Sequence, residues 1–279
     1  MGWLCIAGAL ALLLALYVFM TAPDPRRRAR DLPLLYAHRG LHGADATENG
    51  LEAFERACRV KLGIEFDVRF TRDGEVVVFH DDELERMFGS PGRVDELTLA
   101  ELGAIPLPDG GFVPTLDEVL SLVDGRVPLL IEIKNCRRIA RLCAAVREKL
   151  RNYSGAYAVE SFNPLALRWF RRRAREVLRG QLVAHQEEYM GVTGAVAAFL
   201  LSSLLTNCLS RPDFVAYDLN MARDFSIRVQ RKVYRSKLAA WTVRTRAALN
   251  WLMRTGQSAI LEIEIGKDPI SVLEGERYV

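Results

Sequence analysis

The sequence predicts an α/β fold, most simply a TIM-type (β/α)8 barrel that follows an apolar N-terminal helix. Beyond residue 127, short apolar runs with strand character alternate with helical segments, which is typical of parallel strands covered by helices. We count nine candidate strands, one more than such a barrel needs, and we expect the surplus strand in an antiparallel hairpin. A doubly wound open sheet is the alternative, but the chain lacks the GxGxxG and GxxxxGK[ST] loops typical of that fold.

The N-terminal segment predicts a membrane anchor. Residues 3–20 form an uncharged apolar run that is just long enough to span a bilayer. Basic residues follow this run, namely Arg26, Arg27, Arg28 and Arg30. The positive-inside rule then predicts an uncleaved anchor at 1–22, a basic linker at 23–33 and a cytoplasmic domain at 34–279. A cleaved signal peptide is the alternative, but it calls for basic residues before the apolar run and a small-x-small site after it.

The composition limits the partners that this chain can have. The net charge of the 279 residues is only +3, which gives no basis for a nucleic-acid partner. The five cysteines are scattered without CxxC spacing, so neither a disulfide framework nor a zinc site is predicted, and a reducing compartment fits best. No obligate protein partner is indicated, whereas the anchor predicts contact with a lipid bilayer.

The first half of the barrel domain contains a strand whose two faces differ in polarity. We expect a strand at 34–37, a helix at 51–60 with Thr47 as its N-cap, and strands at 63–70 and 75–79. In the second of these strands, apolar residues alternate with Glu65, Asp67 and Arg69. The turn at 71–74 is too short for a helical crossover, so the strand after it should run antiparallel.

Helix and strand signals then follow each other to the end of the chain. Two helix starts are marked by a Thr with Glu three residues later, at Thr98 and Thr115. We expect strands at 127–133, 156–161, 180–184, 214–217, 238–243 and 259–263, and helices at 138–150, 164–177, 222–234 and 246–255. The uncharged run 191–209 interrupts this rhythm, and it is either a buried helix or a helix docked on the membrane surface.

Acidic residues on two of the strands predict a metal site. Glu65 and Asp67 share one face of their strand, and Glu132 lies on the strand that follows the hairpin. Side chains at the carboxyl ends of parallel barrel strands converge on one face of the barrel. Carboxylates buried together need compensation, which a hard divalent cation with oxygen ligands supplies. Each residue taken alone is better explained by a solvated strand face, so it is their joint placement that favours the metal site.

Basic residues and histidines fall at the same strand ends. Arg39 and Lys134 would neutralise the charge of a phosphate group, the arginine in bidentate fashion and the lysine as a point charge. His38 and His80 have side chains that titrate near neutral pH, so they could act as acid and base. Together with a Lewis-acidic cation, this set of residues suits the cleavage of a phosphodiester.

The ordered motifs resemble the signature of the glycerophosphodiester phosphodiesterase family over about residues 34–245. The matching motifs are His38-Arg39-Gly40, Glu48-Asn49, Gly63–Val68, Thr71–Gly74, Val77–Asp81, Ile131–Lys134, Glu160–Pro164 and Ala240–Val243. The resemblance implies a TIM-barrel enzyme that uses one divalent cation, Ca2+ or Mg2+. It also implies these roles: His38 and His80 as the acid/base pair, Glu65, Asp67 and Glu132 as metal ligands, Arg39 and Lys134 on phosphate, Trp241 lining the substrate pocket and Glu48 shaping it.

The implied reaction is the metal-dependent hydrolysis of a glycerophosphodiester to an alcohol and glycerol 3-phosphate. The anchor and the apolar run 191–209 also suggest a lysophospholipid or phospholipid substrate at the membrane. The run Leu261–Glu264 departs from the family, which has Thr-Asp followed by Pro there, and we expect it to touch no residue assigned to chemistry. A membrane-bound barrel that only binds phosphodiesters is the alternative, and it would be favoured by the loss of a histidine or metal carboxylate, none of which is lost.

Overall fold

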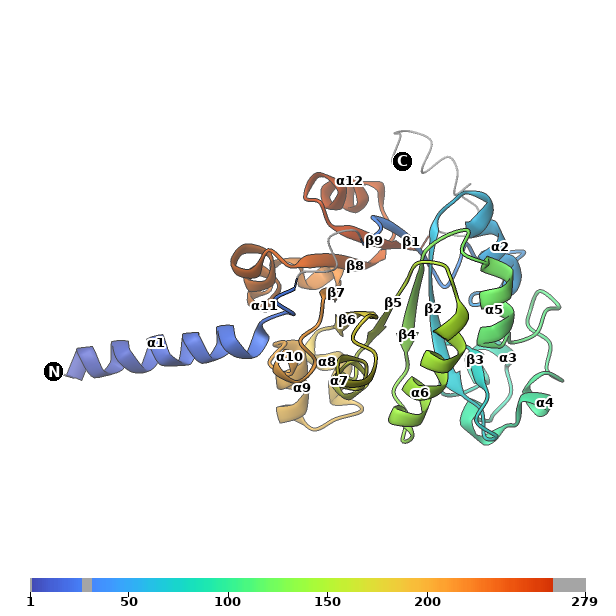
Figure 1. Cartoon of the computed structure of the whole chain (residues 1–279), viewed down its shortest axis with the longest axis horizontal. Helices are drawn as coiled ribbons and strands as arrows, with labels where there is room; N and C mark the ends of the chain where they lie inside the picture. The colour runs from blue at the N-terminus through green and yellow to red at the C-terminus, as the bar shows by residue number, and fades with distance from the viewer. Residues whose placement is uncertain (1, 27–31, 263–279) are drawn as a thin grey trace.

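The computed structural model describes residues 2–26 and 32–262, which contain a closed barrel of parallel strands (Figure 1). Its strands are β1 (Leu35–His38), β2 (Gly63–Phe70), β4 (Leu129–Ile133), β5 (Tyr157–Ser161), β6 (Leu178–Val183), β7 (Phe214–Asp218), β8 (Lys237–Val243) and β9 (Ser258–Leu261). The barrel closes because β1 pairs in parallel with both β9 and β2. Strand β3 (Val76–Val78) pairs antiparallel with β2 outside the barrel, so the predicted surplus hairpin strand is confirmed.

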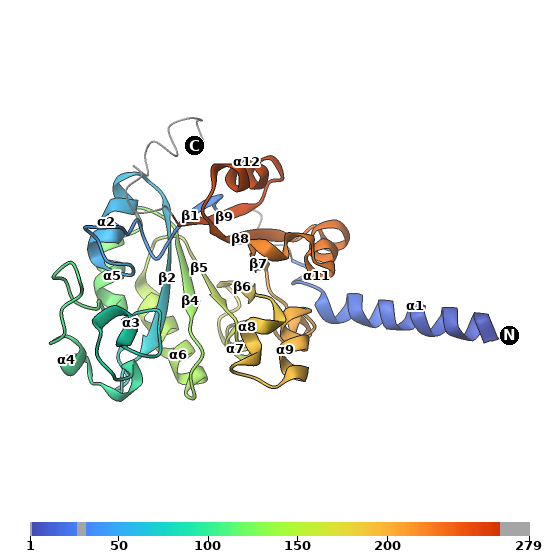
Figure 2. The same ribbon diagram turned by 180° about the vertical axis from the view of Figure 1, so that it is seen from behind.

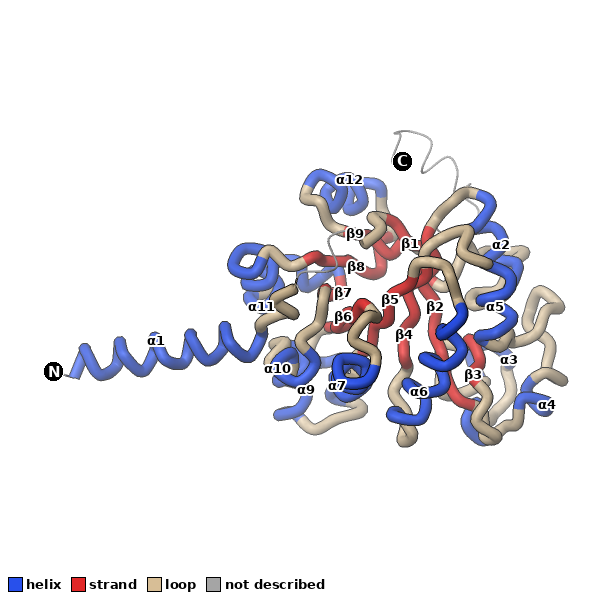
Figure 3. Tube along the Cα trace, in the orientation of Figure 1, coloured by secondary structure: helices blue, strands red, loops and turns tan. Residues whose placement is uncertain are grey.

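Helices surround the strands, as the blue and red segments of Figure 3 show. The α-helices of the barrel domain are α2 (Leu51–Arg59), α3 (Glu85–Phe88), α4 (Leu99–Leu102), α5 (Leu116–Val123), α6 (Ile139–Lys149), α7 (Pro164–Arg173), α8 (Gln186–Met190), α9 (Ala195–Ser202), α10 (Asn207–Ser210), α11 (Phe225–Val229) and α12 (Arg246–Arg254). Short 3₁₀ turns lie at Val94–Glu96, Leu150–Asn152 and Leu219–Arg223, and a π-helical turn lies at Gln230–Tyr234. The capping boxes predicted at Thr98 and Thr115 are both present.

Strand β2 shows how the alternating sequence positions the site. Phe66 and Val68 are fully buried between the strands and the helices, and the Phe66 ring packs on Phe54 of α2 with 5.6 Å between ring centroids. The opposite face of the strand carries Glu65 and Asp67, which are buried as well. Because side chains alternate along a strand, the packing of the apolar face fixes the direction of both carboxylates.

Two local predictions near helix ends are wrong. Thr47 does not cap α2, since the N-cap is Gly50, which offers no side chain. The N–H of Thr47 instead donates to Oδ2 of Asp109 at 2.7 Å, so this residue ties two loops together. The helix expected at 164–177 ends at Arg173.

Two expected helices are divided into shorter pieces. The segment 222–234 is interrupted at Asp224, whose extended backbone makes it the N-cap of α11 rather than a helical residue. The run 191–209 forms α9 and α10, and within α9 only Ala198 is buried. Helix α9 is therefore not a buried helix, and its apolar side chains Val196 and Phe199 are 75% and 52% exposed.

Helix α1 (Gly2–Thr21) projects away from the barrel, and Figures 1 and 2 both show its C-terminal end beside α10 and α11. Among the described residues, Trp3–Thr21 is the one stretch long and apolar enough to cross a membrane, and only 6% of it is buried. Its last residue is held by the barrel domain, because the carbonyl of Thr21 accepts hydrogen bonds from Asn207 at 3.2 Å and Gln230 at 2.7 Å.

Some predictions extend beyond the residues that the structure describes. The basic linker expected at 23–33 includes residues 27–31, and the strand expected at 259–263 includes Ile263. The C-terminal boundary of the expected barrel domain also lies outside the described part of the chain, as does the Glu264 end of the divergent run.

Candidate active site

The carboxyl ends of the strands surround an open cavity of about 620 Å³. Every residue predicted to belong to the site except Asp67 lines this cavity, namely His38, Arg39, Glu48, Glu65, His80, Glu132, Lys134 and Trp241. Several further residues that were not predicted from the sequence line it too, among them His42, Asp81, Arg86, Glu160, Phe162, Glu188, Arg244 and Glu262. The structure therefore brings the predicted side chains together from different strands, as a parallel barrel should.

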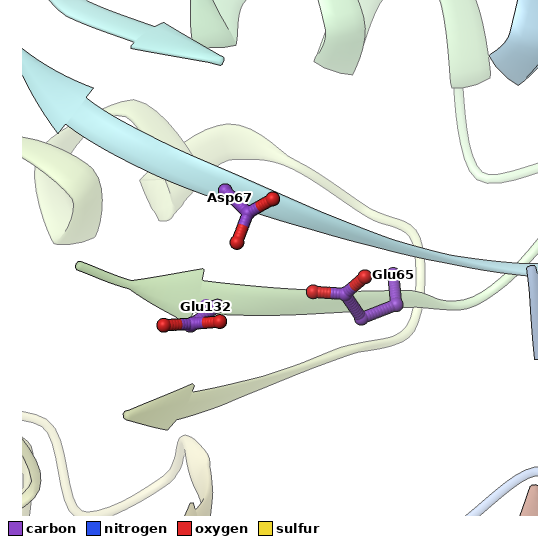
Figure 4. Close-up of side chains that lie close together, drawn as sticks. All are labelled: Glu65, Asp67 and Glu132. Carbon is purple, nitrogen blue, oxygen red and sulfur yellow. The ribbon is translucent and has the colours of Figure 1, made fainter. Parts of the chain in front are cut away.

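Three carboxylates form the centre of the site. Figure 4 shows Glu65 and Asp67 of β2 and Glu132 of β4 with their carboxylates close to one another. One oxygen of each lies within 4.8 Å of the other two, and all three side chains are buried. The register between the strands places Asp67 directly opposite Glu132, so the pairing of β2 with β4 builds the cluster. Three buried oxygen ligands at this spacing can hold a hard divalent cation.

The pKa values of these three carboxyls show how burial and neighbouring charges act on the cluster. Burial, followed by the charge of Asp67, raises the pKa of Glu65 well above its ordinary value. Burial also raises the pKa of Glu132 to about 7. Burial acts on Asp67 in the same direction, but positive charge, first that of Lys134, brings its pKa well below the usual range. A bound cation would favour the ionised form of all three groups, so the donor set fits a divalent metal.

Two basic side chains lie against the carboxylates. Nζ of Lys134 is 3.0 Å from Oε1 of Glu132 and 3.3 Å from Oδ1 of Asp67. Nε of Arg39 is 3.6 Å from Oδ2 of Asp67, while its Nη1 is 2.9 Å from Oε1 of Glu48. The cavity thus carries fixed positive charge immediately beside the oxygen atoms that a metal would use, which is the arrangement that a phosphate group requires.

The loop after β1 adopts left-handed backbone conformations at the positions that aim functional groups. Arg39 has φ 55°, and its backbone N–H donates to Oε2 of Glu65 at 3.1 Å. Asn49 has φ 59°, and its Nδ2 donates to Oδ2 of Asp67 at 2.9 Å. Gly40 has φ 81°, and a Cβ there would lie 2.8 Å from a ring carbon on α2. Non-glycine residues adopt such angles at a cost, which is typical of functional loops.

His38 is held by a carboxylate from the other end of the chain. Its Nδ1 lies 2.8 Å from Oε2 of Glu262, and its Nε2 lies 4.0 Å from Oε2 of Glu65. The hydrogen bond with His38 lowers the pKa of Glu262 to about 2, so this carboxylate is ionised. An ionised carboxylate only accepts, so Nδ1 of His38 donates to Glu262, and Nε2 remains for proton transfer.

Glu262 is also where a prediction from the sequence is wrong. We expected the run Leu261–Glu264 to touch no residue assigned to chemistry, yet its second residue is the partner of His38. The reason is the closure of the barrel, because β9 pairs with β1 and both strands end at the mouth of the cavity. Glu262 could have been found from its position directly after the last strand, where its side chain faces the site.

His80 is oriented in the same way by its neighbour. Its Nδ1 lies 2.7 Å from Oδ1 of Asp81, and Arg86 in turn bonds both Asp81 and Glu48. Burial, opposed by the charge of Asp67, lowers the pKa of His80 to about 4. The imidazole is therefore neutral at pH 7, and its Nε2 can accept a proton.

An aromatic wall closes one side of the cavity. The rings of Trp241 and Phe162 lie 5.7 Å apart between centroids and nearly perpendicular, at 88°. Nε1 of Trp241 and Nε of Arg39 are buried without a hydrogen-bond partner among the described residues. Buried donors are usually paired, so these two N–H groups are available to the oxygen atoms of a ligand.

Glu160 is a fourth carboxyl in the site that the sequence analysis left unassigned. It stands on β5 in register with Glu132, and it is 1% exposed. Its Oε2 has no hydrogen-bond partner among the described residues. Burial, followed by the charge of Glu132, raises the pKa of Glu160 well above its ordinary value. Its strand register beside a predicted metal ligand is the signal that could have identified it.

Comparison with known families agrees with this geometry. A family model described as the glycerophosphoryl diester phosphodiesterase family matches residues 38–262, from His38 to its partner Glu262. This match covers most of the chain and includes every residue of the predicted site. The chain therefore belongs to the glycerophosphoryl diester phosphodiesterase family, a family of phosphoric diester hydrolases.

Curated relatives match parts of the chain. A glycerophosphodiester phosphodiesterase of Caldanaerobacter subterraneus is 32% identical over 53% of this chain and 66% of its own length. One of Bacillus altitudinis is 33% identical over 45% of this chain and 54% of its own length. The chain thus spans between about half and two thirds of the length of these two curated relatives.

Solved structures share the barrel. An Oleispira antarctica phosphodiesterase in complex with the product sn-glycerol-3-phosphate has a TM-score of 0.69 at 24% identity, covering 88% of this chain and 98% of its own. A glycerophosphodiester phosphodiesterase of Thermotoga maritima has a TM-score of 0.64 at 26% identity, covering 82% of this chain and 94% of its own. The predicted TIM-type barrel is confirmed by this shared fold and by the strand pairing.

Proposed function

We propose that this protein hydrolyses glycerophosphodiesters to an alcohol and glycerol 3-phosphate, and that it needs one divalent cation, Ca2+ or Mg2+. The observation that carries the proposal is the convergence of three buried carboxylates, two histidines and two basic side chains on one cavity. Membership of the family supports the reaction, and the Oleispira structure is described as holding sn-glycerol-3-phosphate as a product.

Glu65, Asp67 and Glu132 are the proposed ligands of the cation. Their oxygen atoms are close enough together, and the raised pKa values of Glu65 and Glu132 indicate a need for further positive charge. When bound, the cation would polarise a phosphoryl oxygen as a Lewis acid. Lys134 and Arg39 stand beside the same carboxylates, and we assign them to the remaining phosphate oxygens.

His38 and His80 are the proposed acid/base pair. Each ring bonds a carboxylate through Nδ1, which leaves Nε2 for proton transfer. His80 is neutral at pH 7 and suits the base that takes a proton from the water that attacks phosphorus. His38 suits the acid, because the ionised Glu262 would stabilise its imidazolium form before the proton passes to the leaving alkoxide.

The substrate is held by the walls of the cavity. Trp241 contributes an apolar ring and an unpaired N–H, which suits the carbon chain and hydroxyl groups of a glycerol moiety. Glu48 acts through its bond to Arg39, whose guanidinium it holds beside the carboxylate cluster. Arg86 bonds Glu48 as well, so the same carboxylate couples both arginines to the site.

We further propose that residues 1–22 are a membrane anchor, that the barrel begins after the linker 23–33, and that it lies on the cytoplasmic side. The apolar helix α1 and the basic residues after it support this orientation. Helix α9, which carries exposed apolar side chains, lies near the end of α1 (Figure 1). Tyr189 of the adjacent α8 packs on Phe162 at the cavity wall. A lysophospholipid or phospholipid could therefore reach the site from the bilayer.

The decisive experiment compares soluble and lipid substrates. The full chain, purified in detergent, is incubated with glycerophosphocholine and with lysophosphatidylcholine, with and without EDTA, and with Ca2+ or Mg2+ restored. We expect release of the head-group alcohol or of the phosphate product, loss of turnover in EDTA, and recovery with one of the two cations. No cation-dependent turnover of either substrate would overturn the proposed activity.

A matched set of variants tests the residue roles. We expect His38→Ala and His80→Ala each to lower turnover by about a hundredfold or more. Asp67→Asn should weaken metal binding while leaving the fold intact, because an amide keeps the size of the side chain. His185→Ala is the control, since His185 is 40% exposed and lies beside Asp224 rather than in the cavity. Unchanged turnover in both His38→Ala and His80→Ala would contradict the acid/base assignment.

A further inference from the structure

The end of α1 is built into the barrel domain through its terminal carbonyl groups. Besides the two bonds to Thr21, Nη1 of Arg211 donates to the carbonyls of Phe19 at 2.7 Å and Ala22 at 3.1 Å. The Arg211 guanidinium also lies over the Phe19 ring, 4.7 Å from its centroid. The Tyr17 ring packs against Phe225 of α11. These contacts satisfy carbonyls that a helix end leaves unpaired, and they fix α1 relative to the barrel.

A second cavity of about 840 Å³ lies beside this joint, between α7, α10 and the end of α1. Six arginines line it, Arg26, Arg168, Arg171, Arg172, Arg175 and Arg211, and we call it the arginine cavity. Among the residues that the structure describes, Asp24 is the one acidic residue that lines it. It is separate from the catalytic cavity, since no described residue lines both.

Three of the six arginines have structural partners. Arg26 pairs with Asp24 at 2.7 Å, Arg211 holds α1 as described, and Arg171 bonds the carbonyl of Leu209 at 3.1 Å. Asp24 also lies 3.2 Å from the fully buried Arg179, so its one negative charge is shared between two cations. The joint between α1 and the barrel therefore explains why these arginines are present.

The other three arginines have no such explanation. In the part of the chain that the structure describes, Arg168, Arg172 and Arg175 form no ion pair with an acidic side chain. Their spacing along α7 and just past its end places them on one side, where like charges at i and i+4 repel each other. The negative end of the helix dipole favours cations there, but it does not require them to line a cavity. The arginine cavity thus holds more positive charge than the acidic side chains of the described residues balance, which favours an anionic ligand.

The position of the cavity indicates where the anion would come from, and this step rests on the proposed role of α1 as a membrane anchor. Helix α1 has 20 residues. At about 1.5 Å per residue it spans about 30 Å, the thickness of the hydrocarbon core of a bilayer. Phe19 and Ala22, at the end of that span, line the cavity, so its arginines lie at the level of the lipid phosphates. Exposed apolar atoms of Phe19 and Leu209 stand beside the charges, as an amphiphilic ligand requires.

We propose that the arginine cavity binds the phosphate head group of an anionic phospholipid, and thereby holds the barrel domain against the membrane. Basic pockets next to a spanning helix on the cytoplasmic side are suited to such head groups. Charge-assisted bonds from Arg168, Arg172 and Arg175 would contact the phosphate oxygens, while the acyl chains lie along α1. The lipid bound here is a structural ligand of the joint, distinct from the substrate in the catalytic cavity.

The test measures thermal unfolding of the full chain in non-ionic detergent with added phosphatidylglycerol, phosphatidylcholine or inorganic phosphate. Phosphatidylglycerol at about 100 times its Kd should raise the Tm by about 5–10 °C, and phosphatidylcholine should raise it far less. The triple variant Arg168→Gln, Arg172→Gln, Arg175→Gln should lose the response. The control variant Arg59→Gln, Arg151→Gln, Arg173→Gln removes the same charge outside the cavity and should keep it.

Each alternative outcome identifies a different error. An equal response of the two triple variants would show that the cavity does not bind the lipid. If inorganic phosphate raises the Tm as much as phosphatidylglycerol does, the cavity binds a free anion and not a lipid head group. If phosphatidylcholine raises the Tm equally, the cavity does not prefer anionic lipids. Hydrolysis of glycerophosphocholine, measured in the same samples, separates these results from the proposed activity, because the triple variant leaves every residue of the catalytic cavity in place.

Discussion

In the proposed reaction, Glu262 holds and charges the His38 ring and does not itself contact the substrate. It is ionised, because its pKa is lowered to about 2 first by the hydrogen bond with His38. Its other oxygen accepts from Arg244 at 3.0 Å, so the carboxylate is held on both sides. A fixed negative charge behind an imidazole orients the ring and stabilises its charged form.

We therefore predict that Glu262→Gln lowers kcat by about tenfold to a hundredfold, less than His38→Ala, and leaves KM nearly unchanged. The amide can still accept from Nδ1, so the ring position is kept while the charge is lost. Arg244→Gln is the matched control, because it loosens the same carboxylate without removing it, and its effect should be smaller. Equal kcat values for wild type and Glu262→Gln would show that this carboxylate has no part in proton transfer.

Glu160 leads to a prediction about stability as a function of pH. Its pKa is raised well above the ordinary value of 4.5, first by burial, so the folded protein favours the protonated acid more than the unfolded chain does. Its stabilising contribution is therefore complete below about pH 4.5 and is lost as the pH rises toward the folded pKa. Glu160→Gln, which cannot ionise, should be more stable than wild type at pH 8 and similar at pH 4.

Thermal unfolding in EDTA between pH 4 and pH 8 checks this prediction, since chelation removes the influence of a bound cation. The difference in Tm between Glu160→Gln and wild type should grow steadily with pH. Glu148→Gln is a suitable control, because Glu148 is an exposed residue that pairs with Arg151 on the surface. A constant difference across the pH range would mean that Glu160 is not protonated on folding.

Within single helices and strands, the sequence predicted the features that depend on residues close together in the chain. The capping boxes at Thr98 and Thr115 mark helix starts through hydrogen bonds between residues three positions apart, so both could be predicted. The division of 191–209 was not, because an uninterrupted apolar run has no periodicity that marks the left-handed turn at Leu204. The helix expected at 222–234 is interrupted at Asp224, whose backbone is extended, and it continues from Gln230 as a π-helical turn.

The exposed apolar residues of helix α9 lead to a prediction about how a lipid substrate reaches the catalytic cavity. Val196 and Phe199 are exposed apolar residues of α9. Figure 1 shows α9 near the C-terminal end of α1, where a helix would meet the bilayer if α1 is the anchor. The double variant Val196→Glu, Phe199→Glu should reduce hydrolysis of lysophosphatidylcholine in membranes by about tenfold or more, because charge at a membrane-facing surface opposes docking. Hydrolysis of soluble glycerophosphocholine should be unchanged.

The control for α9 is Phe112→Glu, at an apolar residue that is 54% exposed in the loop between α4 and α5, away from α1. It should leave both reactions unaffected. If the α9 variant and the Phe112 variant reduce lipid hydrolysis equally, or if the α9 variant also loses the soluble reaction, α9 does not deliver lipid to the cavity.

For the whole molecule, the closed barrel was predictable and the placement of α1 was not. Barrel closure follows from the count of alternating elements, with the hairpin strand β3 set aside. The carboxylate cluster follows from the alternation in β2 and the register with β4. The attachment of α1 depends on side chains such as Asn207 and Arg211, which are distant from α1 in the sequence and lie beside it in the folded structure. Neither periodicity nor motif spacing contains that information.

The last prediction concerns this attachment. Asp24 follows α1, is buried, and lies 3.2 Å from Arg179, which also pairs with Asp213 at 3.0 Å. Removing one partner of a buried pair destabilises a protein by about 3–5 kcal/mol when the other charge is left alone. Asp213 remains beside Arg179, so we predict that Asp24→Asn lowers the free energy of unfolding by about 1–3 kcal/mol.

Acid should reduce this difference between wild type and Asp24→Asn. The hydrogen bond with Arg26, followed by the charges of Arg26 and Arg179, lowers the pKa of Asp24 to about 2 in spite of burial. A lowered pKa contributes stability that is present above the ordinary value of 3.8 and is lost as the pH falls toward 2. Denaturant unfolding of both proteins in detergent at pH 7 and pH 3 measures the effect. A difference that is absent at pH 7, or larger at pH 3, would mean that Asp24 does not join α1 to the barrel.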